Sequence, residues 1–521
     1  MLVINDLSLY QIKDLRTIIA DFSFSLQKDM RVALIGEEGN GKSTLLKAIA
    51  KPSSIASYME IKGEIHTTGE IIGYLPQVLA DGVLDQTTDQ YLQQKVDWNQ
   101  FDYSRFYDLM GQMEFPESRI SKEIKLRQLS GGEKIKFQLL CEMLRNPTIL
   151  LLDEPSNDLD LMSVGWLERF INALKIPLMF VSHDEILLER CANTIIHLEQ
   201  LRRKSQPQHT IASLTYSEYV KNRQDQIIRQ TQVARKEQEE YDAKMERYRQ
   251  IYQRVHHEQQ TVSRQAPSVA KNLKDKMHSV KAMGRRFERE KERMTQRPDL
   301  EESILVRFGE TISIPNGKQI IDLHLDTLEA GGLVLSKDLR FAVYGPKKVC
   351  IVGANGSGKT TLLRRILLEL ESSNISYGYM PQDYSEMMNP EETAIQFLAK
   401  TEKKDEHTKV RTYLGSMNFT PEEMFHPVMD LSGGQRAKLY FSKMILDRAE
   451  VLVLDEPTRN LSPLSGPEIR QALRSFAGCI IAVSHDRKFI KEVFDEVLLL
   501  DQNGLQVVNS EQFLDEKRAS R

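Results

Sequence analysis

Two glycine-rich segments have the composition of loops that bind the phosphates of a nucleotide. Each follows a short apolar run, residues 32–35 or 349–352, and precedes a helical pattern. Glycines allow backbone N–H groups to turn toward a phosphate at a helix N-terminus, and a lysine adds positive charge. The predicted contact residues are Gly36, Gly39, Asn40, Gly41, Lys42, Ser43 and Thr44 in the first segment, and Gly353, Asn355, Gly356, Ser357, Gly358, Lys359, Thr360 and Thr361 in the second.

Two further apolar runs end in paired carboxylates, at Asp153–Glu154 and Asp455–Glu456. Such runs are typical of buried parallel strands, which present catalytic groups at their carboxyl ends. We expect each aspartate to hold Mg²⁺ and each glutamate to polarise the water that attacks a γ-phosphate. A histidine within Ser-His-Asp, after another apolar strand, is expected to sense the γ-phosphate. The predicted magnesium ligands are Ser43, Gln77, Asp153, Thr360, Gln382 and Asp455, and the predicted sensors are His183 and His485.

These motifs occur twice, in the same order and with matching spacing. From the serine of Leu-Ser-Gly-Gly to the aspartate of the pair is 23 residues in both copies, and from the glutamate to the histidine is 29 residues in both. The chain therefore contains two copies of one domain. The lysine and the later glutamine are 35 residues apart in the first copy and 23 in the second. We place the additional residues within 51–69, as a surface loop or hairpin.

The composition is that of a large globular protein. The 521 residues, 40% of them hydrophobic, are enough for two or three domains. No segment has the ~18–20 consecutive apolar residues of a membrane span, and the first residues carry acids where a signal peptide is basic and then apolar. These features predict a soluble, cytoplasmic protein. Four cysteines that lie far apart are expected to be buried reduced thiols: Cys141, Cys191, Cys350 and Cys479.

The segment between the two copies is basic and helical. Residues 217–297 contain eight Lys and twelve Arg against twelve acidic residues, although the whole chain has a net charge of −4. This charge favours contact with a polyanion, or else belongs to solvated helix faces. Apolar residues at spacings of three, four or seven predict two helices that pair as an antiparallel hairpin, with its tip near residues 259–268. The two stripes are Tyr241, Met245, Tyr248, Tyr252 and Val255, and Leu273, Met277, Val280, Phe287 and Met294.

The Leu-Ser-Gly-Gly segments separate this chain from other phosphate-loop proteins. They resemble the signature motif of ATP-binding-cassette proteins. The resemblance implies that two cassettes pack head to tail, so that each ATP lies between one phosphate loop and the opposite signature. ATP then closes the pair, and hydrolysis lets it open. An aromatic side chain often stacks on adenine in this family; Tyr10 lies at the matching distance from the first loop, but it could equally be a strand core residue. The predicted signature contacts are Ser130, Gly131, Gly132, Ser432, Gly433 and Gly434.

Two cassettes, a basic hairpin between them and no membrane segment together resemble the ABC-F family of translation factors. This resemblance implies an α/β protein with P-loop cassette domains at residues 1–212 and 301–521, joined by a helical hairpin linker at 213–300. It also implies ATP and Mg²⁺ as cofactors, a monomer with intramolecular cassette pairing, and the ribosome as partner. In that family the linker enters the tRNA exit site and reaches toward the peptidyl-transferase centre.

The second carboxylate motif narrows the resemblance. Asp455-Glu-Pro is followed by Thr-Arg-Asn-Leu-Ser, where that family usually has Thr-Asn-His-Leu-Asp. The changed motif resembles that of the Vga and Lsa-like branch of the family, which protects ribosomes against lincosamides, streptogramin A and pleuromutilins. The resemblance places the tip near rRNA, tRNA and the drug-binding region. The tip residues expected to act there are Val262, Arg264 and Gln265.

Three other functions fit parts of the pattern. A housekeeping ABC-F regulator of translation would have the same architecture without drug resistance. The detached ATPase of a membrane exporter would have the cassettes, but the long hairpin has no evident use in it. A chromosome or repair ATPase also joins cassette halves by helices, but each end of such a chain carries only half of the motifs.

Overall fold

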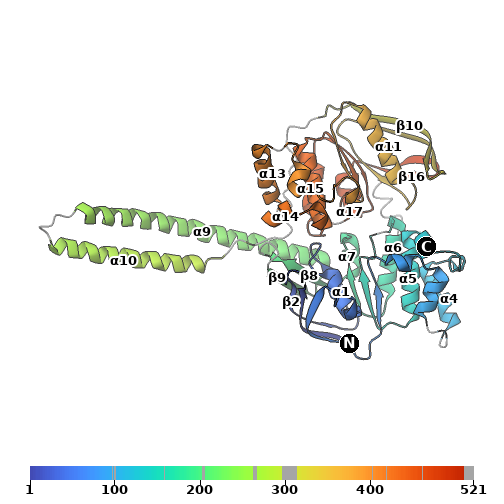
Figure 1. Ribbon diagram of the computed structural model, residues 1–521, viewed down its shortest axis with the longest axis horizontal. Coiled ribbons are helices and arrows are strands. Elements are labelled where there is room, and N and C mark those ends of the chain that lie inside the picture. The colour runs from blue at the N-terminus through green and yellow to red at the C-terminus, as the bar shows by residue number, and fades with distance from the viewer. Residues whose placement is uncertain are drawn as a thin grey trace. The chain divides into compact units, whose positions relative to one another are not determined.

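The computed structural model describes residues 1–509 except 97, 99–100, 158, 202–205, 262–266, 296–297, 299–313, 402, 418 and 460. Contacts between residues divide the chain into two compact units. Met1–Tyr216 together with Glu301–Arg521 forms one unit, and Ser217–Leu300 forms the other. The first unit holds both cassettes and the second is the linker (Figure 1).

A six-stranded sheet forms the centre of the first cassette, in the order β5-β6-β7-β3-β8-β9. Neighbouring strands run parallel except for the last pair. Apolar side chains form a continuous run in β6, and all of its residues are buried. Such runs are typical of parallel strands that are covered on both faces. The strands are β3 (Arg31–Ile35), β5 (Ile72–Leu75), β6 (Ile149–Asp153), β7 (Leu178–Val181), β8 (Thr194–Gln200) and β9 (Gln206–Ala212).

The second cassette repeats this sheet in the equivalent order β13-β14-β15-β12-β16-β17. Its last pair is again antiparallel. All residues of β14 and β15 are buried. The catalytic loops therefore leave the same edge of an equivalent sheet in each cassette. The strands are β12 (Lys348–Val352), β13 (Tyr377–Met380), β14 (Val451–Asp455), β15 (Cys479–Val483), β16 (Glu496–Asp501) and β17 (Gly504–Val508).

The helices follow the strands that carry the motifs. In the first cassette they are α1 (Lys42–Ala50), α2 (Asp81–Leu84), α3 (Thr88–Lys95), α4 (Tyr103–Met113), α5 (Gly131–Leu144), α6 (Leu161–Ala173) and α7 (Glu185–Cys191). In the second they are α11 (Lys359–Ser372), α12 (Ala394–Leu398), α13 (Lys404–Ser416), α14 (Pro421–Phe425), α15 (Gly433–Leu446), α16 (Gly466–Ser475) and α17 (Arg487–Val493). The two P-loop motifs and the two signature motifs thus each lie directly before a helix.

A smaller antiparallel sheet accompanies each central sheet and differs between the copies. The first has the order β2-β1-β4, built from β1 (Leu2–Gln11), β2 (Thr17–Leu26) and β4 (Met59–His66). In the described part of the second cassette it consists of β10 (Gln319–Ala330) and β11 (Leu333–Tyr344). The additional residues of the first copy therefore lie where they were predicted, but they form the short helix η1 (Pro52–Ser54) and an edge strand instead of a loop or hairpin. The strand forms because the edge of β1 offers unpaired backbone groups.

The linker is an antiparallel pair of helices that lie side by side, α9 (Tyr216–Thr261) and α10 (Pro267–Glu292) (Figure 1). Val255, Met277 and Val280 are buried between the helices, and Tyr248 and Tyr252 pack against them. The predicted seam is therefore present. The helices approach the tip more closely than expected, because α9 continues beyond residue 259 and α10 begins before residue 268.

The length of the linker follows from its helical geometry. The 46 residues of α9, at about 1.5 Å per residue, make a helix of roughly 70 Å. A glycine in α10, Gly284, lies against the hydroxyl end of Tyr248, where a Cβ would approach to 2.6 Å. Gly284 therefore leaves space for the ring of Tyr248 between the two helices. The predicted tip residues Val262, Arg264 and Gln265 lie outside the described residues.

Two predictions about the chain as a whole can be compared with the fold. Among the residues described, we find no helix with both the length and the apolarity needed to cross a membrane. The four cysteines are buried free thiols, as expected. Burial raises the pKa of each of these thiols, so they remain protonated at neutral pH.

Candidate functional site

Each cassette places its motif residues around one phosphate loop; we call the surroundings of Lys42 site 1 and those of Lys359 site 2. Gly41 and Gly358 have left-handed φ angles of 89° and 97° and directly precede α1 and α11. At Gly41 a Cβ would come within 2.5 Å of Ile18, so a side chain does not fit there. Each loop therefore turns sharply and ends at a helix N-terminus, which favours an anion.

The two lysines fold back over their own loops. Nζ of Lys42 donates to the carbonyl oxygens of Gly36 and Glu37, at 2.8 and 2.9 Å. Lys359 makes the equivalent bonds, at 3.1 and 2.9 Å. Burial lowers the pKa of Lys359, and nearby carboxylates oppose this effect. Both ammonium groups lie where a phosphate of ATP would compete with the loop carbonyls for them.

Two of the three residues expected to hold magnesium contact each other in each site, a hydroxyl residue and an aspartate. Ser43 Oγ donates to Asp153 at 2.8 Å, and Thr360 Oγ1 donates to Asp455 at 2.9 Å. Burial raises the pKa of both aspartates, that of Asp455 to about 6. A hydroxyl and a carboxylate are hard oxygen donors, and Mg²⁺ is usually held by one or two carboxylates together with substrate phosphates. The residues present fit a Mg²⁺ ion bound jointly with ATP.

The two glutamates after these aspartates have an unusual backbone. Glu154 and Glu456 have φ angles of 50° and 52°, in the left-handed region that non-glycine residues rarely adopt. Their backbone N–H groups donate to Val181 and Val483, the last residues of the neighbouring strands. Strain of this kind clusters at functional sites. The backbone therefore points both carboxylates in a fixed direction at the end of the sheet.

In site 1 the glutamate is surrounded by hydrogen-bond donors. Glu154 Oε2 accepts from Gln77 Nε2 at 2.9 Å and from Asn157, and His183 Nε2 lies 3.1 Å from Oε1. The other ring nitrogen of the histidine lies 2.6 Å from the carbonyl oxygen of Leu461. Burial opposes ionisation, but His183, Lys42 and the donated hydrogen bonds outweigh it and lower the pKa of Glu154 to about 2. This carboxylate is ionised at any physiological pH.

In site 2 the equivalent glutamate has fewer partners. Glu456 Oε2 accepts from the backbone N–H of His485 at 3.2 Å, and the histidine Nε2 is 3.7 Å from Oε1. Oε1 accepts no hydrogen bond from the residues that the structure describes. Burial raises the pKa of Glu456 to about 7, and the His485 N–H and Lys359 counteract it only in part. This carboxyl group can therefore exchange a proton near neutral pH, as a general base must.

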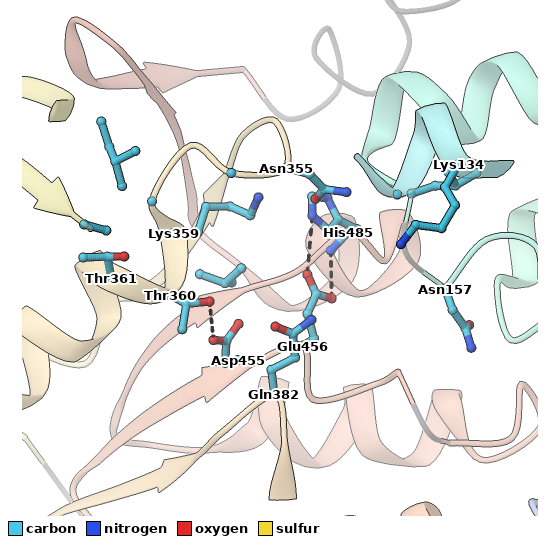
Figure 2. Close-up of a pocket in the computed structure, with 17 residues that line it drawn as sticks. Lys134, Asn157, Asn355, Lys359, Thr360, Thr361, Gln382, Asp455, Glu456 and His485 are labelled. Atoms are coloured by element: carbon cyan, nitrogen blue, oxygen red, sulfur yellow. Dashed lines mark hydrogen bonds and ion pairs between the residues drawn. The ribbon is translucent and has the colours of Figure 1, made fainter. Parts of the chain in front are cut away.

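Site 2 is a cavity of about 510 Å³ whose wall comes from both cassettes. Gly131 and Lys134 of α5, with Asn157, belong to this wall together with residues of the second P-loop. Figure 2 shows Lys134 reaching toward His485 and Asn355. The structure thus brings one signature helix to the opposite P-loop, in the head-to-tail manner. The predicted residues in this wall are Gly131, Asn355, Gly356, Gly358, Lys359, Thr360, Thr361, Gln382, Asp455, Glu456 and His485.

Site 1 is a smaller cavity of about 270 Å³. The residues that form its wall all belong to the first cassette. The side chain of Asn40 donates to the carbonyl oxygen of Leu198, and Asn40 is not part of this wall. The predicted residues in this wall are Gly39, Gly41, Lys42, Ser43, Thr44, Gln77, Glu154 and His183. The predicted residues in neither wall are Tyr10, Gly36, Asn40, Ser130, Gly132, Asp153, Gly353, Ser357, Ser432, Gly433 and Gly434.

The aromatic residue at site 1 is not the predicted one. Tyr10 lies on β1, with Lys62 Nζ 4.7 Å from its ring centroid, and is not part of the cavity wall. Tyr58, which directly precedes β4, is in the wall together with Gln11. Sequence reasoning missed Tyr58 because it belongs to the additional segment of the first cassette. Site 2 has Ala330 and no described aromatic residue in the corresponding wall.

The signature serines act as helix caps. Ser130 and Ser432 each accept a backbone N–H in a capping box, with Glu133 and Gln435 as the reciprocal partners. Their role in the described structure is therefore to fix the start of α5 and α15. The two helix N-termini are then held in a defined position, where their first N–H groups can bind an anion.

Two acidic residues of the first P-loop were not predicted to have a role, yet both contact the second cassette. Glu38 Oε2 accepts from the backbone N–H of Gly434 at 2.9 Å. Glu37 Oε1 accepts from Ser465 Oγ, also at 2.9 Å. The signal that could have found them is the difference between the two loops, since the second has alanine and asparagine at these positions.

Buried ion pairs also connect the two cassettes. Arg470 donates to Glu185. Arg487 forms an ion pair with Glu168 and donates to Asp184 at 3.0 Å. All four side chains of the two Arg–Glu pairs are at most 10% exposed. Pairs desolvated to this degree add little net stability, but they strongly penalise any arrangement that separates the partners.

Duplicated P-loops, carboxylate pairs and signature helices on equivalent sheets define an ABC-type ATPase with two cassettes. A model of the family described as ABC transporter matches residues 19–157 and 336–459, about half of the chain. The ribosome protection protein VmlR of Bacillus subtilis (strain 168) is 28% identical over 515 residues, which cover 95% of this chain and 86% of that protein. ABC transporter F family member 5 of Arabidopsis thaliana is 24% identical over 540 residues, covering 94% of this chain and 74% of that one.

The chain belongs to the ABC-F family of ATP-binding-cassette proteins. Among solved structures, one chain in the complex of archaeal ribosomal stalk protein aP1 with the archaeal ribosome recycling factor aABCE1 has the same fold. That likeness has a TM-score of 0.60 at 15% identity and covers 98% of this chain and 92% of that chain.

Proposed function

We propose that this ABC-F ATPase binds ribosomes and protects them from antibiotics that act at the peptidyl-transferase centre, of the lincosamide, streptogramin A and pleuromutilin type. The linker enters through the tRNA exit site, its tip acts near rRNA, tRNA and the drug site, and ATP hydrolysis drives release. The protein acts as a monomer in the cytoplasm, where its ribosomes are. The observation that carries this proposal is the hairpin of α9 and α10 between two cassettes.

Two features of the linker support contact with RNA. The helix α9 is roughly 70 Å long, so the linker can reach far into a large assembly. Its sequence has eight more basic than acidic residues between 217 and 297, and most charged side chains of α9 and α10 are exposed. Basic exposed helices bind phosphate backbones without needing a particular sequence. A relative that covers almost the whole chain bears the name ribosome protection protein, which favours the same role.

The ATP cycle is assigned to the residues of the two sites. Lys42 and Lys359 bind the phosphates of ATP, and their loss should weaken nucleotide binding itself. Mg²⁺, when bound with ATP by Ser43 and Asp153 or by their counterparts in site 2, neutralises phosphate charge. Glu154 and Glu456 each orient and deprotonate the attacking water. The paired histidine holds its glutamate in place and senses the γ-phosphate.

Nucleotide binding tests these assignments. Lys42→Ala and Lys359→Ala are each expected to remove one of two binding events for ATP and Mg²⁺, measured by calorimetry on the whole chain. Lys348→Ala, on strand β12 outside both loops, is the control and should bind like the parent. Unchanged affinity and stoichiometry in both loop variants would show that the sites are elsewhere.

Ribosome binding and drug susceptibility test the function. Expression in a drug-sensitive bacterium should raise the inhibitory concentration of at least one of the three drug classes, and the chain should sediment with ribosomes when ATP hydrolysis is blocked. Sedimentation without any change in susceptibility would favour a housekeeping regulator of translation. Association with membranes instead of ribosomes would favour an exporter subunit.

The tip requires separate variants because it should affect drugs and not ATP chemistry. Substitution of Val262, Arg264 or Gln265, or deletion of residues 265–268, is expected to change the level or spectrum of resistance and to leave ATP turnover in solution unchanged. Arg264 is assigned an rRNA phosphate as partner. Resistance that keeps the parent level and spectrum in every variant would exclude the tip as the effector.

A further inference from the structure

The two P-loops differ in charge at the positions nearest the opposite cassette. Site 1 has Glu37 and Glu38 where site 2 has Ala354 and Asn355. Two carboxylates beside a site for a triphosphate are unfavourable, because like charges repel over several ångströms. The roles assigned above to Lys42 and its neighbours do not require either of them. Their position therefore calls for a separate explanation.

The geometry of Glu38 provides one. Its carboxylate accepts from the N–H of Gly434, the second residue of α15. Gly434 belongs to the signature motif, whose free N–H groups and helix dipole are the features that attract an anion. A carboxylate oxygen at 2.9 Å from this nitrogen occupies a position that an ATP phosphate oxygen would need in a closed site. The protein thus places its own anion against its own signature helix.

Site 2 has the opposite arrangement. Its P-loop presents Asn355, which carries no charge, and Gly131 and Lys134 of the facing signature helix lie in the cavity wall. Site 1 has Glu38 in its wall, and no described residue of α15 is part of that wall. Asn355 and Glu38 are equivalent residues, so the two cavities differ in charge at this position.

The two sites also differ in the loop that precedes α6 in the first cassette and α16 in the second. In site 2 this loop carries a carboxylate, that of Asp160. It caps α6 by accepting from the backbone N–H of Ser163 at 2.9 Å. Burial opposes the ionisation of Asp160. The hydrogen bonds from Ser163, the charge of His485 and the backbone N–H of Asn355 outweigh burial and lower the pKa of Asp160. In site 1 the equivalent residue is Ser462, and the carboxylate has moved to the P-loop, where Glu37 accepts from the hydroxyl of Ser465.

We infer that Glu38 is a built-in competitor of the ATP γ-phosphate for the signature helix of the second cassette, and that it makes site 1 the weaker site for ATP. The inference rests on the two nucleotide sites assigned under the proposed function. For ATP to close site 1, its γ-phosphate must displace the Glu38 carboxylate from Gly434. ADP has no γ-phosphate and does not enter this competition.

The test is nucleotide binding to the full chain in a background in which only site 1 can bind. Lys359→Ala removes site 2, and Glu38→Gln and Glu38→Asn are compared with the parent residue in that background, by titration with ATP or ADP and Mg²⁺. Either substitution should tighten ATP binding about tenfold, because the competing charge-assisted hydrogen bond and its charge are both lost. The gain for ADP should be much smaller.

Two matched variants complete the design. Glu64→Gln removes an exposed carboxylate of β4 and should leave both affinities unchanged. Asn355→Glu in a Lys42→Ala background transfers the competitor to site 2 and should weaken ATP binding there about tenfold. Thermal unfolding of each variant, measured without nucleotide, separates misfolding from an effect on binding.

The possible results are distinct. Unchanged or weaker ATP binding in both Glu38 variants would overturn the inference, and weaker binding would mean that Glu38 helps to hold ATP. An equal gain for ATP and ADP would also overturn it, since it would indicate general repulsion and not competition for the signature helix. Loss of nucleotide binding in the Lys359→Ala parent and in all its Glu38 variants, with site 2 intact in Lys42→Ala, would exclude site 1 as a nucleotide site. Failure of both lysine variants and of the parent to bind would instead refute the proposed function.

Discussion

Replacing Glu456 with glutamine should remove most of the ATP turnover and, with it, the pH dependence of the reaction near neutrality. In site 2 this carboxyl group is buried and its pKa is raised to about 7. In site 1 the pKa of Glu154 is lowered to about 2 by His183 and other partners, which outweigh its burial. A base with a pKa near the working pH is the more effective proton acceptor. Site 2 should therefore supply the larger share of turnover.

The size of the pH effect follows from the titration of this one group. With a pKa of about 7, roughly a tenth of Glu456 is ionised at pH 6 and roughly nine tenths at pH 8, so turnover should rise about ninefold between them. Glu154 is ionised over the whole range and contributes no slope. Glu456→Gln should lower turnover at site 2 about 100-fold or more, so that the remaining turnover comes mainly from site 1 and should be flat with pH. Glu154→Gln should keep the rise.

The assay is steady-state phosphate release by the purified chain, from pH 5.5 to 9 at saturating ATP and Mg²⁺. Thermal unfolding gives an independent check on the same group. A raised carboxyl pKa means that the folded state loses stability as the pH rises from the ordinary value of 4.5 through about 7. Glu456→Gln should therefore gain stability over the parent between pH 5 and pH 8, by up to roughly 3 kcal/mol.

Superimposable pH profiles of the parent and Glu456→Gln would refute this reasoning. So would a larger loss of turnover in Glu154→Gln than in Glu456→Gln. A stability difference between parent and Glu456→Gln that shrinks as the pH rises would show that the carboxyl group is not buried as a neutral acid.

Three further predictions concern the cycle, the cassette contact and the linker. Glu154→Gln combined with Glu456→Gln should keep ATP binding and remain on ribosomes in sedimentation with ATP; rapid release would contradict the cycle. Arg487→Met removes one of the two arginines that contact Glu168 and the arginine that contacts Asp184, and it should cost about 2–3 kcal/mol, seen as a melting temperature lower by several degrees; a melting temperature equal to that of the parent would argue against the contact. Gly284→Val should clash with Tyr248 and loosen the hairpin, with faster proteolysis of the linker and weaker ribosome binding but unchanged ATP turnover in solution. Gly82→Val, at an uncrowded helical position, is its control, and equal proteolysis of the two variants would count against the predicted clash.

The fold class was predictable because its signals are local. A P-loop needs a strand, a glycine turn and a helix in that order, and the spacing of two copies identified a duplicated domain. The seam of the linker was predictable for the same reason, since Tyr248, Val255 and Met277 lie on helical faces of fixed period. The helix ends near the tip were off by two or three residues, as is usual for boundaries without strong caps.

The rest depended on contacts between segments distant in sequence. Tyr10 was placed by its distance from the P-loop, but the edge of β1 pairs with β4 and brings Tyr58 to the cavity instead. The contact of Glu38 with Gly434 spans 396 residues, and neither residue type indicates its partner. The different pKa directions of the two catalytic glutamates also arise from packing, because their local sequences are nearly the same.

The buried Arg–Glu pairs have a consequence for which cassettes can associate. Glu168 and Arg470 occupy equivalent positions in the two copies, 302 residues apart, and so do Glu185 and Arg487. Two first cassettes brought together in the same way would bury glutamate against glutamate, and two second cassettes would bury arginine against arginine. Only the unlike pair neutralises both contacts. The duplicated domain has thus diverged at this surface into complementary halves, and separate chains of this protein are directed away from exchanging cassettes of the same kind.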